Sequence, residues 1–190
     1  VEIDPTLRIN KLKLVGNRIT NASLAEVRLL AMVNLLSIEG TQITNDGLGN
    51  LKGMTKLRSL RLWSRRFTDS ALVYLKGLPG LESLDLEGTT IQGTKLAQLS
   101  ELTTLRTLIL GPYVEDAALE ALRSLPALEE LDLRACHHVS EAGLKQLEGL
   151  QNLRILWLPV QITERSERRL RQALPKCDVR RSTAFPEAAA

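Results

Sequence analysis

The sequence offers few side chains that could catalyse a reaction or hold a metal ion. Its only histidines, His137 and His138, follow Cys136 directly, and cysteine and histidine are favoured zinc ligands. A zinc site needs about four ligands, and the second cysteine, Cys177, lies 41 residues further on. Two adjacent histidines do not make a catalytic triad, and the chain has no glycine-rich phosphate loop. We therefore expect no enzyme activity, no metal ion and no cofactor.

Side chains typical of binding surfaces are better represented. Tryptophan and arginine are the residue types most often found as binding hot spots. Trp63 shares a short segment with Arg61 and Arg65, and the second tryptophan, Trp157, follows Ile155. Whether these side chains share a surface depends on the elements that carry them.

A repeated pattern, Leu-x-x-Leu-x-Leu, supplies those elements. Its copies start at Ile9, Val33, Leu57, Leu81, Leu105, Leu128 and Leu153, with spacings of 24, 24, 24, 24, 23 and 25 residues. The two departures cancel, and both fall in the turn after the pattern, where a change of length is tolerated. With 39 leucines and only 3% aromatic residues among 190, the chain predicts one elongated domain with an aliphatic core.

Each copy continues with a residue pattern of helical period. Leu72, Leu75 and Leu78 form one such Leu-x-x-Leu-x-x-Leu run, so each repeat is expected to be a short strand, a turn and a short helix. Hydroxyl side chains precede several of these runs and fit helix N-caps: Thr44, Thr68, Ser140 and Thr163. One unit cannot bury its apolar face alone, so the units must stack. Because helices are wider than strands, we expect a curved parallel sheet on the concave face and helices on the convex face.

At this point the sequence resembles the leucine-rich repeat proteins, from Ile9 to about Val179. It is most similar to the cysteine-containing and bacterial subtype of 24-residue repeats, which read Leu-x-x-Leu-x-Leu-x-Gly-Thr-x-Ile-Thr-Asp-x-Gly-Leu. Residues 36–48 and 131–144 are the best copies, and residues 170–179 resemble the terminal unit of that family. The resemblance implies an α/β leucine-rich repeat solenoid of about seven repeats with a C-terminal cap. It does not name a partner, since a fold does not fix a function.

The repeat divides the chain into four segments. Residues 1–8 are expected to be an N-terminal edge segment, and residues 9–158 the strands and helices of the repeats. Residues 159–181 would form the final repeat helix and a closing strand, and residues 182–190 a disordered tail. No apolar run approaches the roughly 18 residues of a membrane span.

The residues that the repeat itself does not require point to a binding surface. The leucines of each strand point inward, as Leu84 does, so the alternate residues, such as Asp85, face solvent on the concave side. The expected partner-binding residues are Arg61, Trp63, Arg65, Asp85, Glu87, Ile109, Tyr113, Asp132, Arg134, Ile155 and Trp157. They predict a non-catalytic interaction module for a protein or peptide, whose acidic residues favour a ligand with lysine or arginine among apolar groups.

Two simpler interpretations remain open for the tryptophans. Trp63 could be an exposed ring stacked on a neighbouring arginine while Arg61 pairs with Asp85. Trp157 could be covered by the C-terminal tail, which contains Phe185.

The distribution of charged residues and the two ends of the repeat array indicate which kinds of partner to expect. Residues 1–158 carry 18 basic and 18 acidic side chains, and residues 159–190 carry 7 and 4, so we expect no nucleic-acid partner. The alternative to a binding module is a structural or scaffold part of a larger polypeptide or complex, held through the open N-terminal sheet edge and the basic last helix. By family analogy alone, the substrate-receptor arm of a ubiquitin ligase is a further alternative. The chain is expected to be monomeric unless that edge pairs, and the sequence does not indicate a compartment.

Overall fold

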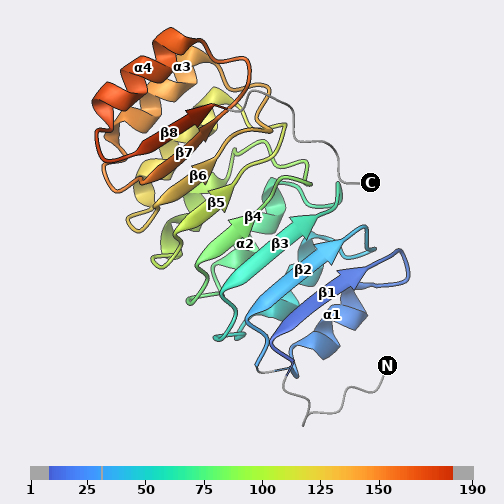
Figure 1. The fold of residues 1–190 in the computed structure, drawn as a ribbon. Helices are drawn as coiled ribbons and strands as arrows, with labels where there is room; N and C mark the ends of the chain where they lie inside the picture. Colours follow the sequence, from blue (N-terminus) through green and yellow to red (C-terminus); the bar gives the residue numbers. More distant parts are fainter. Residues whose placement is uncertain (1–8, 31, 182–190) are drawn as a thin grey trace.

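The computed structural model describes residues 9–30 and 32–181, which form one curved array. Its sheet contains eight parallel strands that follow one another in chain order (Figure 1). The strands are β1 (Lys11–Val15), β2 (Leu35–Glu39), β3 (Ser59–Trp63), β4 (Ser83–Asp85), β5 (Thr107–Ile109), β6 (Glu130–Asp132), β7 (Ile155–Leu158) and β8 (Asp178–Arg181). The expected edge segment 1–8 and the expected tail with Phe185 lie outside the described residues.

The leucine pattern sets the register of the sheet. Leu60 pairs with Leu84, and Leu84 with Leu108, so equivalent positions of successive repeats lie side by side. All three side chains are buried. Each repeat therefore places its leucines against those of its neighbours, in one continuous aliphatic core.

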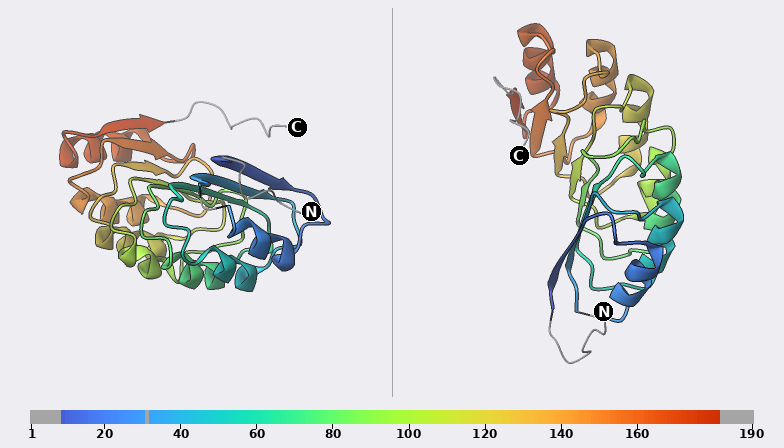
Figure 2. Two further views of the ribbon diagram at one scale, coloured as in Figure 1. Left: turned by 90° about the horizontal axis from the view of Figure 1, so that it is seen from below. Right: turned by 90° about the vertical axis from the view of Figure 1, so that its right-hand side faces the viewer.

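Short helices cover the convex face of the sheet, on the outer side of the arc (Figure 2). The α-helices are α1 (Asn21–Val27), α2 (Leu72–Leu75), α3 (Glu141–Leu144) and α4 (Glu164–Ala173). The 3-10 helices are η1 (Asn45–Leu51), η2 (Asp69–Ala71), η3 (Leu96–Glu101), η4 (Asp116–Ser124) and η5 (Lys145–Gly149). None of the helices in the described part of the chain is long and apolar enough to cross a membrane. Much of the helical layer is thus 3-10 helix, which rises about 2.0 Å per residue and spans a short repeat with fewer residues.

Side chains link the helix starts of several successive repeats. Asn45 donates to the Thr68 hydroxyl at 2.9 Å and accepts from the Thr68 backbone N–H at 3.1 Å. Asn21 makes the same pair of bonds to Thr44. Asp69 accepts from the N–H groups of Gln92 and Gly93, Asp116 accepts from Ser140, and Glu141 accepts from the Thr163 hydroxyl. We call these five side chains, Asn21, Asn45, Asp69, Asp116 and Glu141, the cap ladder.

The cap ladder corrects part of the N-cap expectation. Ser140 and Thr163 do accept hydrogen bonds from helical N–H groups, those of Ala142 and Ser166. Thr44 and Thr68 occupy N-cap positions, but neither hydroxyl accepts a bond from its own helix. Each instead accepts from the asparagine of the preceding repeat.

Replacing Asn45 by alanine should lower the free energy of unfolding by about 1–2 kcal/mol, because the Thr68 N–H loses its acceptor. Chemical denaturation measures the change. Asn17→Ala is the matched control, since Asn17 is exposed and makes no hydrogen bond within the described residues. Equal unfolding midpoints for the two variants would contradict the role of the ladder in stability.

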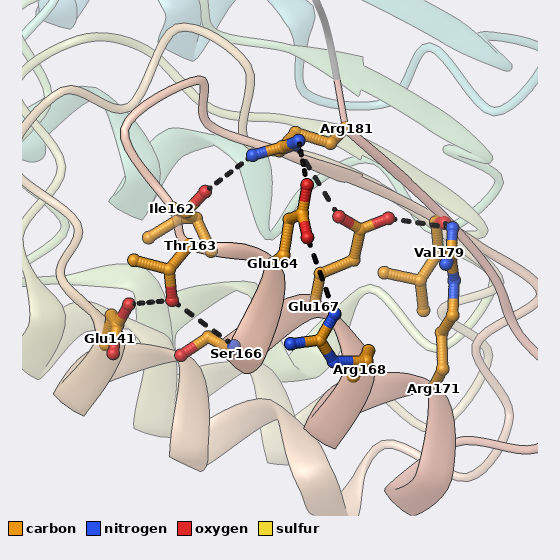
Figure 3. Close-up of polar contacts among 10 residues, drawn as sticks. All are labelled: Glu141, Ile162, Thr163, Glu164, Ser166, Glu167, Arg168, Arg171, Val179 and Arg181. Carbon is orange, nitrogen blue, oxygen red and sulfur yellow. Dashed lines mark hydrogen bonds and ion pairs between the residues drawn. The ribbon is translucent and has the colours of Figure 1, made fainter.

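The last repeat ends in α4 and β8, which are joined by ion pairs (Figure 3). The Glu167 side chain is only 12% exposed and lies 2.7 Å from Arg171 and 3.5 Å from Arg181. Arg181 also donates to the carbonyl of Ile162, and Arg171 to that of Val179. Arg165, Arg168 and Arg171 are exposed, and much of the positive charge at this end is compensated by carboxylates of the same chain.

The first repeat is less well covered than the others. Leu12 and Leu14 are half-buried, whereas the equivalent leucines of β3, Leu60 and Leu62, are buried. Strand β1 has a neighbour on one side only in the described sheet. The Thr20 N–H, which has no asparagine of a preceding repeat among the described residues, bonds to Ser23 of its own helix at 3.2 Å.

Candidate binding surface

One row of side chains crosses the concave face in register. Arg61 pairs with Asp85, Asp85 with Ile109, and Ile109 with Asp132 on successive strands β3 to β6. Asp132 is followed by Trp157 on β7. Five of the residues expected from the sequence therefore lie side by side on one surface, and Ile155 lies on the same strand as Trp157.

Trp63 is stacked on an arginine and is also partly exposed. Trp63 is 38% exposed, and the Arg61 guanidinium lies over its ring, 4.4 Å from the ring centre. Arg61 also lies 3.2 Å from a carboxylate oxygen of Asp85. The stacked arginine and the ion pair are thus present, and they hold the ring in place while leaving part of it accessible.

Trp157 lies between two arginines. Arg134 is 4.6 Å from the ring centre and Arg180, on β8, is 4.8 Å from it. Arg134 is itself fixed by Asp132, with the closest contact at 2.5 Å. Arg180 is not among the binding residues expected from the sequence, because its place beside Trp157 depends on β8 pairing with β7 in that register.

The concave carboxylates are partly withdrawn from water. Asp85 lies in the concave row, but its side chain is only 15% exposed and not open to solvent, and this burial raises its pKa. The physical reason is that Arg61 lies against the carboxylate, which also accepts from the Glu87 N–H at 3.0 Å. Burial likewise raises the pKa of Glu87, helped by the negative charges of Asp85 and Asp132.

Two hollows lie along this surface. A groove of about 460 Å³ covers the N-terminal half of the sheet and has the Arg61–Asp85 pair and Ile109 in its lining. Small residues that the sequence analysis did not select, Ser37, Ser59 and Ser83, make room for it. A smaller pocket of about 280 Å³ lies where strands β3 and β4 end.

The smaller pocket brings together four of the expected residues. It is lined by Trp63, Ser64, Arg65, Glu87, Gly88, Thr89, Pro112 and Tyr113. Glycine is needed at position 111 beside it, because a Cβ there would lie 2.9 Å from the carbonyl oxygens of Leu86 and Glu87. This close approach accompanies the turn that is one residue shorter than in the other repeats.

Cys136 is buried in the core, and burial raises the pKa of its thiol, which disfavours a reactive thiolate. Burial also raises the pKa of Cys177, to about 11. In residues 9–30 and 32–181 no three His, Cys, Asp or Glu side chains are grouped so that they could hold a metal ion.

Comparisons with known proteins find solved structures with a similar fold. No protein-family model matches the sequence, and no curated protein matches it. Among solved structures, internalin C2 from Listeria monocytogenes is similar at a TM-score of 0.61 and 22% identity, covering 95% of this chain and 76% of the internalin. The complex of TLR13 with ssRNA13 is similar at a TM-score of 0.63 and 17% identity, covering 90% of this chain but only 25% of TLR13.

These likenesses concern the fold. The neighbours are leucine-rich repeat proteins, and the single sheet of eight parallel strands with its helical layer matches theirs. The match does not extend to a subtype, so the cysteine-containing and bacterial form stays a prediction. The chain is an α/β leucine-rich repeat solenoid.

Proposed function

We propose that this protein is a non-catalytic interaction module that binds a protein or peptide on its concave face. The observation that carries the proposal is the row from Arg61 to Trp157, with Trp63 beside it. Both tryptophans of the chain lie on this face, each with an arginine over its ring. Rings that are fixed in place and still accessible lose little conformational entropy when a partner covers them, which is why such residues dominate binding energies.

The charges of this face favour a polypeptide over a polyanion. The solved TLR13 structure is a complex with single-stranded RNA. Here Asp85, Glu87 and Asp132 lie at the centre of the face, and their potential would repel phosphate groups. Arg61, Arg134 and Arg180, the arginines stacked on the two tryptophans, are already paired with Asp85, Asp132 and Asp178.

Selection of binders from a random peptide library on the immobilised chain tests the proposal. The dissociation constants of the selected peptides are then measured for the parent and for the Trp63→Ala/Trp157→Ala variant. Because a hot-spot side chain contributes about 2 kcal/mol or more, the double variant should bind at least about 100-fold more weakly.

The control variant removes exposed apolar side chains elsewhere. Leu29→Ala/Val73→Ala changes residues that are 60% and 45% exposed and lie outside the concave row. It should bind as the parent does, and circular dichroism should show both variants folded. Peptides that bind the tryptophan variant as tightly as the parent would contradict the proposal.

A scaffold role is the second candidate, and one observation favours it. The half-buried Leu12 and Leu14 of the first repeat leave an apolar end that another part of a larger assembly could cover. Under that role the chain is held by its ends, so binders that ignore both tryptophans would favour it.

A further inference from the structure

The small pocket at the ends of β3 and β4 combines aromatic rings with an acid. Trp63 and Tyr113 both line it, and Glu87 lies in the same lining. Gly88 lies against Trp63, since a Cβ at position 88 would come within 2.5 Å of the indole ring. At about 280 Å³ the pocket has room for a single side chain rather than for a whole segment of a ligand.

Glu87 is the concave carboxylate at the pocket that lacks a cation. Asp85 lies 3.2 Å from Arg61, and Asp132 lies 2.5 Å from Arg134. In the described part of the chain, no hydrogen bond or ion pair reaches the Glu87 carboxylate. Arg65 lines the same pocket, but its guanidinium is exposed and not within ion-pair distance of Glu87.

An incoming cation would relieve this imbalance. Asp85, Glu87 and Asp132 lie close enough to repel one another, and Arg61 and Arg134 form their ion pairs with Asp85 and Asp132, so Glu87 has no ion pair of its own among the described residues. A positive group placed on Glu87 gains from that potential and also from the nearby aromatic rings, which attract cations. An uncharged side chain of the same size would gain neither.

We propose that this pocket binds one lysine or arginine side chain of the ligand, with its positive group on the Glu87 carboxylate and its stem between Trp63 and Tyr113. The inference rests on the proposed binding of a polypeptide to the concave face. It adds to that proposal the kind of ligand side chain that the pocket would bind. Glu87 supplies the charge, and the two aromatic residues supply the walls.

Titration of the protein with amino-acid amides tests the pocket directly. The probes are N-acetyl-arginine amide and N-acetyl-lysine amide, with N-acetyl-norleucine amide as the uncharged counterpart. The signal is the indole N–H resonance of Trp63 in an NMR spectrum, assigned with the Trp157→Phe variant, which leaves Trp63 as the sole tryptophan. Both cationic amides should shift this resonance in a saturable manner, and the norleucine amide should not.

Matched variants separate charge from shape. Glu87→Gln keeps the size of the side chain and should weaken the cationic amides at least about tenfold. Glu120→Gln removes the same charge from an exposed position without an ion pair among the described residues, and should leave the titration unchanged. Tyr113→Ala, which leaves Glu87 in place, should also weaken both cationic amides.

The outcomes also distinguish this inference from the proposed function. Equal shifts with the norleucine amide, or unchanged binding to Glu87→Gln, would overturn the cation pocket. If the selected peptides still require Trp63 and Trp157 in that case, the concave-face proposal stands without the pocket. If the cationic amides bind through Glu87 while the peptides ignore the tryptophans, the pocket stands and the concave-face proposal fails.

Discussion

Replacing Leu84 by alanine should lower the free energy of unfolding by about 2–5 kcal/mol. Leu84 is fully buried in β4 and lies between Leu60 and Leu108 of the neighbouring repeats. Truncation leaves a cavity that two packed repeats border, and neither can collapse into it without moving the sheet. Leu108→Ala should cost a similar amount. Chemical denaturation followed by circular dichroism measures both changes.

Two further variants test whether this loss of stability is specific to buried leucines of the middle repeats. Asp85→Ala, one residue further along, should change stability by no more than about 1 kcal/mol, because Asp85 lies on the concave side. Its burial raises its pKa, so the fold does not favour its charge, and little is lost with it. Leu12→Ala should cost less than Leu84→Ala, since Leu12 is only half-buried. If Asp85→Ala proved as damaging as Leu84→Ala, the inner and outer faces would be wrongly assigned.

Phe67→Ala should destabilise the protein by about 3–5 kcal/mol. Phe67 is the fully buried aromatic residue in a column of aliphatic residues, at the position that Ile43 and Ile91 occupy in the adjacent repeats. Its backbone N–H bonds to the carbonyl of Ser64, and its carbonyl accepts from the Thr90 N–H at 3.0 Å. Removing the ring should therefore loosen the turn that follows Trp63 as well as the core.

Phe67→Leu provides the graded control. Leucine fills much of the space and should cost less than half as much as alanine, because the remaining cavity is smaller. The cationic amides report on the turn at the same time. They should bind Phe67→Leu nearly as well as the parent and Phe67→Ala more weakly. Equal stability of the two variants would contradict tight packing around Phe67.

The order and register of the strands were predictable because they depend on spacing alone. A repeat of nearly constant length puts Leu60, Leu84 and Leu108 in line, and the same counting puts Arg61 and Asp85 beside each other on the other face. Counting does not depend on side-chain conformation, so it works without a structure.

Features that depend on how far a side chain reaches were not predictable in this way. The Arg180 guanidinium meets Trp157 only because β8 closes the sheet, and Asn45 reaches Thr68 only because the turns of adjacent repeats come close. Glu87 has no ion pair among the described residues because Arg61 pairs with Asp85 and Arg134 pairs with Asp132. Several pairings were compatible with the sequence, and local geometry decides among them.

The cap ladder has a direction. Each of its side chains belongs to the earlier repeat and satisfies the helix start of the later one, as Asn21 does for Thr44 and Asp116 for Ser140. Among the described residues α1 differs, because the Thr20 N–H bonds to Ser23 of the same repeat. A ribosome releases the chain from its N-terminus, so each repeat that the cap ladder serves would meet a finished repeat that already presents its hydrogen-bond partner. The polarity of the ladder thus matches the polarity of synthesis, and the array can grow one repeat at a time without waiting for residues not yet made.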